Sequence, residues 1–379
     1  MKLGILTQPL LNNYGGILQA FALQQKLKDL GHNPFIINRM YPKPGVKAKF
    51  KTAVKNIFYR YISTTKVVQL PLDGKEYNRI YSRICDFKSK YIFPITNEIY
   101  DTDSMIKLKS FGFKAFVVGS DQVWRQAYSP CITNYFLDFA LSFKDVKKIS
   151  YAASFGTSNW DVDKNKTKLI SKLAGNFNAI SVREASGINL CKEYLNVDAI
   201  QVLDPTMLLD VKVYKQLILK EGEQTSDGSL MSYFLDDSKI KSNYIEELSQ
   251  KINLVHFSIL PKTRSGKRAR QTIKEEVFPS VTKWLKGFCD AEFIITDSFH
   301  GCVFSILFNK PFIAVGNTKR GVARFESLLD KFDLKERLIL DFEKINYDLS
   351  IKKIDWDKVN LILEKEREES IKFLSDNLK

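Results

Sequence analysis

One short stretch of the sequence combines a side chain that can move a proton with a backbone that can hold an anion. Residues 294–304 read IITDSFHGCVF, an apolar run that is broken by polar residues and then resumes. The pattern predicts a buried strand followed by a helix over residues 302–308. His300 would then lie at the start of that helix, where unpaired backbone N–H groups and the helix dipole favour an anion. An imidazole there could pass a proton to or from the bound ligand.

The same stretch also has a purely structural interpretation. Asp297 or Ser298 could be the N-cap of the helix, and Gly301 could be a tight-turn residue. The chain has only three histidines, and the other two are weaker candidates. His32 follows a helix-ending glycine, and His256 lies within an expected strand.

Small, charged and polar residues follow several other expected strands. Because ligands of open parallel sheets bind beyond the carboxyl ends of the strands, we expect these side chains to face one cleft. A turn after the first strand adds two more residues to the set. The candidates outside residues 294–304 are Asn13, Gly15, Ser120, Asp121, Ser154, Arg183 and Glu184.

Short apolar runs alternate with helical patterns along the chain, which is typical of parallel sheets covered by helices. The 379 residues, 44% of them hydrophobic, suffice for two cores. We predict an α/β protein with two Rossmann-like parallel-sheet domains. Their expected extents are residues 1–206 and 207–350, and residues 351–379 would form a helix that packs back across both domains.

The composition points to anionic partners and to a cytoplasmic protein. Lysine and arginine number 58 against 43 acidic residues, a net charge of +15. The five cysteines are scattered and no Cys-x-x-Cys occurs, so neither a zinc site nor a disulfide framework is expected. No apolar run approaches the roughly 18 residues that span a bilayer, and the amino terminus does not resemble a signal peptide.

Two basic segments stand apart from the strand–helix alternation. Residues 43–60 interleave lysines with apolar side chains, which fits either a solvated helix or an element that contacts an anionic membrane surface or the acceptor. Residues 261–271 form a basic loop that lacks the first glycine of a Walker motif. No dinucleotide fingerprint and no recognised nucleic-acid motif occurs, so no nucleic-acid partner is expected.

Six pieces of the sequence together resemble the polysaccharide pyruvyl transferase family. They run in order over residues 1–332 and read NNYGGILQAFAL, VVGSDQVW, SYAASFG, ISVREASG, LDPTMLL and FIITDSFHGCVFSILFNKPFIAV. The resemblance implies a fold like that of GT-B glycosyltransferases. It also implies phosphoenolpyruvate as donor, with no cofactor or metal, and a glycan or lipid-linked saccharide of a surface or capsular polysaccharide as acceptor.

The resemblance also assigns residues. The family's essential histidine corresponds to His300, and its strand-end arginine corresponds to Arg183. Many members carry Arg-Leu-His where this chain has Ser298-Phe299-His300. A cation from elsewhere must then help to bind the donor, and Lys319, Arg320 and Arg324 are the nearest candidates in the sequence.

These assignments give a mechanistic hypothesis. His300 would be the general acid, Asp121 or Glu184 would accept a hydroxyl proton, and Arg183 would bind the donor's carboxylate or phosphate. We expect His300 and Arg183 on opposite domains, with an anion-sized space between them. The other substrate-binding candidates are Asn13, Gly15, Ser120, Ser154, Asp297, Ser298, Gly301, Arg320 and Arg324. The alternative function is a GT-B glycosyltransferase that uses a nucleotide-sugar donor.

Overall fold

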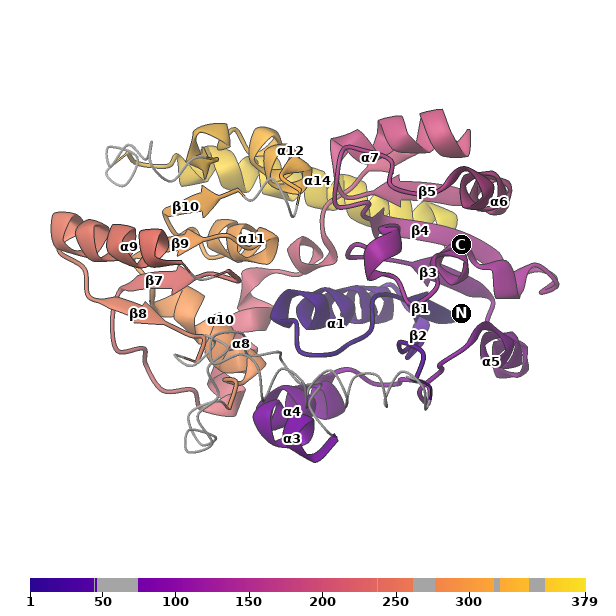
Figure 1. The fold of residues 1–379 in the computed structure, drawn as a ribbon, viewed down its shortest axis with the longest axis horizontal. Helices are drawn as coiled ribbons and strands as arrows, with labels where there is room; N and C mark the ends of the chain where they lie inside the picture. Colours follow the sequence, from indigo (N-terminus) through magenta and orange to yellow (C-terminus); the bar gives the residue numbers. More distant parts are fainter. Residues whose placement is uncertain (44, 46–73, 237, 262–276, 317–320, 341–351) are drawn as a thin grey trace, which may run out of the picture.

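Two parallel β-sheets with flanking helices organise the chain (Figure 1). The computed structural model describes residues 1–43, 45, 74–236, 238–261, 277–316, 321–340 and 352–379. The first sheet has six strands in the order β2-β1-β3-β4-β5-β6, and the second has five in the order β11-β10-β9-β7-β8. Every strand pair is parallel. The prediction of two parallel-sheet α/β domains is confirmed.

The strands of the first sheet are short and mostly buried, and their side chains alternate between two apolar clusters. Val117 belongs to the cluster on one face, whereas Phe116 and Val118 belong to the cluster on the other. The bounds of the strands are β1 Lys2–Leu6, β2 Asn33–Ile36, β3 Ala115–Val118, β4 Lys147–Ala153, β5 Ala179–Val182 and β6 Ile200–Gln201. The helices of this half are α1 Tyr14–Asp29, α3 Gly74–Ile80, α4 Ser82–Tyr91, α5 Thr102–Ile106, α6 Lys164–Ala174 and α7 Ala185–Leu190, which a π-helical turn, Cys191–Leu195, continues.

The second sheet repeats the architecture with fewer strands. Its strands are β7 Leu230–Tyr233, β8 His256–Ser258, β9 Phe293–Thr296, β10 Phe312–Val315 and β11 Leu338–Ile339. Its helices are α8 Val211–Glu221, α9 Lys239–Ile252, α10 Val281–Asp290, α11 Phe299–Leu307 and α12 Ala323–Lys331. Within the described residues no helix is long and apolar enough to cross a membrane.

The two halves share one continuous apolar cluster rather than two isolated cores. Tyr14, at the start of α1, stacks on Trp284 of α10 with ring centroids 5.7 Å apart. Its hydroxyl donates to the Pro279 carbonyl at 2.8 Å. Trp284 in turn meets Phe304 of α11 edge to face at 5.0 Å. An apolar contact of this kind fixes the relative placement of the two halves better than a polar one would.

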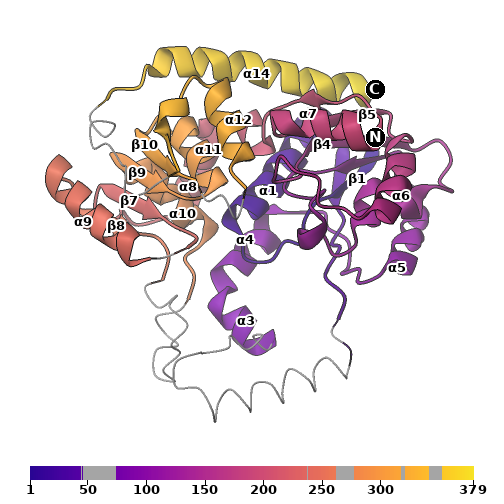
Figure 2. The ribbon, with the colours of Figure 1, turned by 45° about the horizontal axis from the view of Figure 1, so that its top comes forward.

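The last helix, α14 (Trp356–Asn377), runs across both halves (Figure 2). In the first half the Ser370 hydroxyl accepts from the Leu203 amide at 3.0 Å. In the second half Glu366 pairs with Lys331 of α12 at 2.6 Å. The helix therefore connects the two halves on the side away from α3 (Figure 2). The boundaries expected at residues 206 and 350 stay predictions.

Candidate active site

The two sheets present their topological switch points to each other. In the first sheet β1 lies between β2 and β3, so the chain leaves β1 toward one side and later adds β3 on the other side. In the second sheet β7 lies in the same way between β8 and β9. Ligands of such sheets bind at these points, beyond the carboxyl ends of the strands. Asn13 and Gly15 follow β1, Asp121 follows β3, and His300 follows β9. A Cβ on Gly15 would lie 2.1 Å from the His300 Nδ1, so the first turns of two helices, one from each half, meet at this histidine.

The helix that carries His300 begins earlier than the sequence predicts. The Ser298 side chain accepts from the Gly301 amide at 3.4 Å and is the N-cap of α11, so α11 starts at Phe299 instead of Cys302. His300 therefore lies in the first turn. Gly301 is a helical residue whose missing Cβ leaves room for the Thr296 hydroxyl, 2.2 Å from that position. The error arose because the prediction followed the apolar run that resumes at Cys302, whereas the first turn of α11 begins directly after its cap.

Asp297 is buried, and its carboxylate ties the loop after β7 to the end of β9. It accepts hydrogen bonds from the Leu235 amide at 2.6 Å and the Asp236 amide at 3.1 Å. It also pairs with the Lys241 ammonium at 2.6 Å. These contacts position the loop that precedes His300. Substrate binding by Asp297 stays a prediction.

One buried carboxylate, Asp204, joins the two residues that the sequence singles out most strongly. The same oxygen, Oδ2, lies 2.8 Å from the Arg183 Nη1 and 3.5 Å from the His300 Nε2. The other oxygen accepts from the Thr206 amide at 3.0 Å and from the Thr206 hydroxyl at 2.7 Å. Burial acts to raise the pKa of Asp204, but its contacts with His300 and Arg183 outweigh burial and hold that pKa well below its usual range.

His300 and Arg183 thus lie on opposite halves of the molecule. The prediction of an anion-sized space between them is wrong. The Asp204 carboxylate occupies that place and provides the negative charge from within the chain. The physical reason is burial. The Arg183 side chain is 2% exposed, and a cation that is so deeply buried needs a fixed counter-charge.

A second carboxylate, Asp121, completes the surroundings of Arg183. Its Oδ1 lies 3.4 Å from the Arg183 Nη2 and accepts from the Gln122 amide at 2.9 Å. The backbone of Asp121 has φ 71°, a left-handed conformation that is costly for a non-glycine residue and is often found at functional sites. Burial lowers the pKa of Arg183, but Asp204 and Asp121 outweigh it and the pKa is raised. The donor-binding role of Arg183 stays a prediction.

Glu184 and Ser154 are fully buried, and they shape the loop after β4. The Glu184 Oε1 accepts from the Ser154 hydroxyl at 3.0 Å, from the Phe155 amide at 2.7 Å and from the Gly156 amide at 3.0 Å. Ser120 is buried too, and its hydroxyl donates to the Ala152 carbonyl at 3.0 Å. In this structure all three side chains hold loops in place beside the site.

An arginine from the second half approaches the same place without a partner. Phe299 lies between two guanidinium groups, with the Arg183 carbon 4.5 Å and the Arg324 carbon 5.7 Å from its ring centroid. Within the described residues Arg324 makes no hydrogen bond and no ion pair. Burial, and then the nearby Arg183 cation, lower the pKa of Arg324 to about 10, which still leaves it charged at neutral pH. Within the described residues the Arg324 cation therefore has no direct carboxylate contact, although Asp121 and Glu184 lie near enough to act on its pKa.

Comparison with protein families identifies the chain. The family model for polysaccharide pyruvyl transferase matches residues 13–319, most of the chain. The chain belongs to this family. No match was found among curated proteins.

The fold of this pyruvyl transferase is that of GT-B enzymes. A structure of Arabidopsis thaliana UGT89C1 complexed with UDP-L-rhamnose superimposes with a TM-score of 0.53 at 9% identity, covering 99% of this chain and 98% of that chain. Acinetobacter baumannii MurG gives a TM-score of 0.45 at 9% identity, with 99% and 98% covered. Neisseria meningitidis UDP-GlcNAc 2-epimerase bound to UDP-GlcNAc gives 0.46 at 12% identity, with 96% and 99% covered. The TM-score of 0.53 to UGT89C1 at 9% identity indicates a shared fold, and activity is a separate question.

Sequence reasoning assigned no role to one residue of the site. Asp204 follows β6 and belongs to the LDPTMLL piece of the family resemblance, so its position at a strand end was the available signal. Of the cations expected to replace the missing arginine of the pyruvyl transferase motif, Arg324 lies beside Phe299, whereas Lys319 and Arg320 lie outside the described residues. Residues 46–60 and 262–271, most of the two basic segments, also lie outside the described residues.

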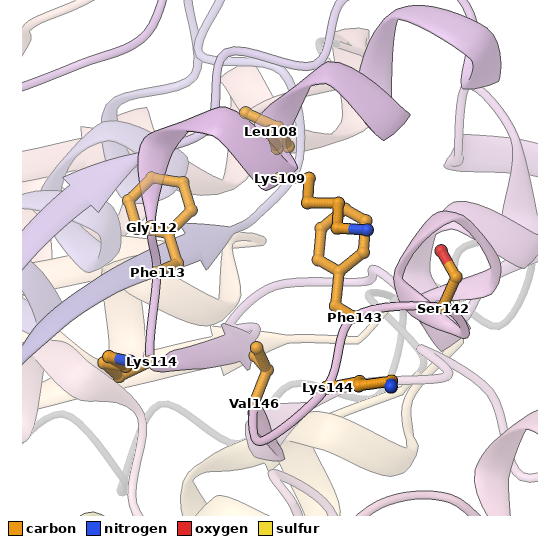
Figure 3. A pocket seen from close by; sticks show the side chains of 9 residues that line it. All are labelled: Leu108, Lys109, Gly112, Phe113, Lys114, Ser142, Phe143, Lys144 and Val146. Carbon is orange, nitrogen blue, oxygen red and sulfur yellow. The ribbon is translucent and has the colours of Figure 1, made fainter.

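A cavity elsewhere in the pyruvyl transferase lies at the opposite edge of the first sheet (Figure 3). Its volume is about 270 Å³, and it lies next to the amino-terminal ends of β3 and β4. It is lined by Leu108, Lys109, Gly112, Phe113, Lys114, Ser142, Phe143, Lys144 and Val146. Parallel sheets bind their ligands at the carboxyl ends of the strands, so this cavity does not belong to the candidate active site.

Proposed function

We propose that this pyruvyl transferase moves pyruvate from phosphoenolpyruvate onto a diol of a sugar in a surface or capsular polysaccharide precursor. One observation carries the proposal: the unpaired guanidinium of Arg324 adjoins the buried network of Arg183, Asp204 and His300. Phosphoenolpyruvate has two anionic groups, a carboxylate and a phosphate, both attached to the central carbon that the sugar hydroxyl attacks. An arginine without a carboxylate partner supplies the charge that such a donor needs.

His300 is the general acid of the proposed reaction. The N-termini of α1 and α11 meet at this residue, because Gly15 lies in the first turn of α1 and His300 in the first turn of α11. Both helix dipoles are positive there and favour the donor's phosphate. The Asp204 Oδ2 lies 3.5 Å from the His300 Nε2, which makes no hydrogen bond within the described residues, so Asp204 acts on His300 through its charge and is a positioning residue in this scheme.

The bonds of the reaction balance without a further reactant. The methylene carbon of phosphoenolpyruvate receives a proton from His300, and the cation that forms at the central carbon is attacked by one sugar hydroxyl. The second hydroxyl attacks the same carbon when phosphate leaves, which closes the ketal. Of the two hydroxyl protons, one restores the proton that His300 gave and the other leaves with the phosphate.

Asp121 is the proposed base for the attacking hydroxyl. Its Oδ1 is bound to Arg183 and to the Gln122 amide, whereas its Oδ2 faces the first turn of α1, 3.4 Å from where a Cβ on Gly16 would be. Glu184 is a weaker candidate, because it is fully buried: its Oε1 accepts three hydrogen bonds from the loop after β4, and its Oε2, although without a hydrogen-bond partner among the described residues, is closed off from solvent. The arrangement therefore favours Asp121 for proton acceptance.

The direct test supplies the protein with phosphoenolpyruvate and a set of free and lipid-linked sugars. We expect one ketal-linked pyruvate by mass analysis and one phosphate released for each sugar modified. His300→Ala should lower the turnover rate roughly 10²–10⁴-fold, the usual contribution of a general acid. Lys335→Met changes an exposed surface residue and is the matched control.

A parallel reaction replaces phosphoenolpyruvate with UDP-sugars. Glycosyl transfer in that reaction, together with no pyruvate transfer in the first, would reject the proposal in favour of a nucleotide-sugar glycosyltransferase. Full activity of His300→Ala with phosphoenolpyruvate would retain the donor and reject the role of the histidine.

A further inference from the structure

A pair of tyrosines adjoins the proposed base but has no part in the donor chemistry. Tyr128 lies in the loop that follows β3 and Asp121, and Tyr41 follows β2. The Tyr41 hydroxyl donates to the Tyr128 backbone carbonyl at 2.8 Å, so the Tyr41 side chain is tied to the backbone of the Tyr128 loop. Tyr41 is 44% exposed and Tyr128 is 39% exposed, unlike most aromatic residues of the first half, which are buried.

The loop that carries Tyr128 is held firmly against the first sheet. The Gln8 amide donates to the Gln122 carbonyl at 2.8 Å, and the Ser129 hydroxyl donates to the Val123 carbonyl at 2.6 Å. The Arg125 guanidinium lies over the Tyr128 ring, 4.4 Å from its centroid, and donates to the Gln122 side chain at 3.0 Å. One face of the Tyr128 ring is therefore covered by a fixed cation, and the exposed part of the ring is left for a ligand.

The loop of Tyr128 connects the tyrosine pair to the candidate active site. Arg125, whose guanidinium lies over the Tyr128 ring, donates to the Gln122 side chain at 3.0 Å, and Gln122 directly follows Asp121. The Asp121 carboxylate, after burial, is also a cause of the raised pKa of Tyr41. Asp121 is also the residue that contacts Arg183 at 3.4 Å. A ligand that lies on the tyrosines can thus present a polar group to Asp121 while the donor lies toward Arg324 and His300.

We propose that Tyr128 and Tyr41 form the acceptor subsite, on which a pyranose ring stacks with its diol toward Asp121. This inference rests on the proposed function for the identity of the reaction. A pyranose has an apolar C–H face and a polar rim, and it matches an amphipathic aromatic ring backed by a fixed cation. A nucleotide or a lipid chain matches less well, because the described surroundings combine the Tyr128 phenol and the Asp121 carboxylate with two exposed rings.

The kinetic test compares variants at Tyr128 in the full-length protein. Tyr128→Ala should raise the KM for the sugar acceptor roughly 3- to 10-fold, the factor that corresponds to one lost ring contact, and should leave the KM for phosphoenolpyruvate unchanged. Tyr128→Phe keeps the ring and should keep the acceptor KM. An unchanged acceptor KM in Tyr128→Ala, or an equal rise in both KM values, would overturn the inference.

Phe111→Ala is the matched control, because it removes a half-buried ring that also faces a cation. The Lys2 ammonium lies 5.6 Å from the Phe111 ring, and Phe111 precedes β3 whereas Tyr128 follows it. This control should leave both KM values unchanged. A rise in its acceptor KM equal to that of Tyr128→Ala would show a general loss of structure and would count against the subsite.

A binding measurement separates this inference from the proposed function. Saturation-transfer NMR without any donor would use the methyl pyranosides of galactose, mannose and N-acetylmannosamine as probes. A signal from a sugar in the natural protein that fades in Tyr128→Ala supports the subsite even if no pyruvate is transferred. Equal signals in both proteins, or no signal from any probe in either, would overturn it, and pyruvate transfer would then have to be judged on its own assay.

Discussion

Two arginines flank the ring of Phe299, and they differ in how their charge is balanced. Arg183, from the first half, is 2% exposed and has a carboxylate at each end of its guanidinium group, Asp204 at 2.8 Å and Asp121 at 3.4 Å. Arg324, from the second half, has no such partner among the described residues. A paired and buried arginine is part of the scaffold, whereas an unpaired one beside a catalytic candidate is available for a ligand.

The pKa values of the two arginines shift in opposite directions, because burial lowers both but only Arg183 has direct carboxylate partners. Burial lowers both pKa values, but Asp204 and Asp121 outweigh burial at Arg183 and raise its pKa. At Arg324 the next largest influence is the Arg183 cation, and the pKa falls to about 10. The first arginine is therefore stabilised as a cation by the protein, and the second would be stabilised by an added anion.

The largest expected effect follows from removing the paired arginine. Arg183→Met leaves Asp204 and Asp121 without their shared cation, and it should lower the free energy of unfolding by about 3–5 kcal/mol. Thermal or urea unfolding followed by circular dichroism measures this loss. The control Lys335→Met breaks an exposed pair with Asp330 and should leave the melting temperature unchanged. An unchanged melting temperature in Arg183→Met would mean that the buried pairs do not support the fold.

The next effect concerns donor binding and should appear at the other arginine. Arg324→Met should raise the KM for phosphoenolpyruvate roughly 10- to 100-fold, because charged hydrogen bonds to the donor are lost. Its melting temperature should stay the same or increase, since an unpaired cation is removed from a half-buried position. Arg324→Lys should recover part of the affinity, because an ammonium keeps the charge and loses the fork. Loss of stability without a change in KM would reverse the assignment of the two arginines.

The contrast between the two arginines also shows how far the sequence alone can lead. Strand and helix patterns are local, so the two sheets follow from apolar runs and their spacing. Parallel strands end at one edge, which is why His300 and Asp121 could be placed at the site. Whether Arg183 or Arg324 is paired depends on contacts between distant parts of the chain. Asp204 lies 21 residues from Arg183 in sequence, and its contact with His300 exists only because the two halves pack together.

Residue types alone do not decide two smaller features of the site. Asp297 and Ser298 are both good caps, and only the structure shows that Ser298 caps α11 while Asp297 binds the loop after β7. Glu184 and Arg183 are adjacent in sequence but have different partners. Glu184 binds the loop after β4, whereas Arg183 contacts Asp204. Neighbouring residues at the end of a strand point to opposite faces, so adjacency is poor evidence of an ion pair.

The two arginines should also differ in how they contribute to the pH dependence of stability in acid. The pKa of Asp204 lies below its ordinary value of 3.8, so its contribution to stability is fully present above that value and is lost as the pH falls toward the folded-state pKa. Each pH unit below about 4 should cost about 1.4 kcal/mol for this group. Asp204→Asn should reduce this acid slope, whereas Arg324→Met should keep it. Urea unfolding at a series of acidic pH values gives both slopes, and an equal slope in natural protein and Asp204→Asn would contradict the pairing.

The smallest expected effect tests the ring that the two arginines share. Phe299→Leu keeps an apolar side chain but removes the aromatic face, and it should cost about 1 kcal/mol of unfolding free energy. Most of that cost should persist when the same change is made in Arg324→Met, because Arg183 lies nearer to the ring, at 4.5 Å against 5.7 Å. The four proteins form a double-mutant cycle that isolates the coupling between Phe299 and Arg324. A coupling close to zero would mean that the Phe299 ring does not stabilise the position of Arg324, which α12 alone would then hold. A coupling as large as the full cost of Phe299→Leu would show that the ring holds Arg324 in preference to Arg183, against the order of the two distances.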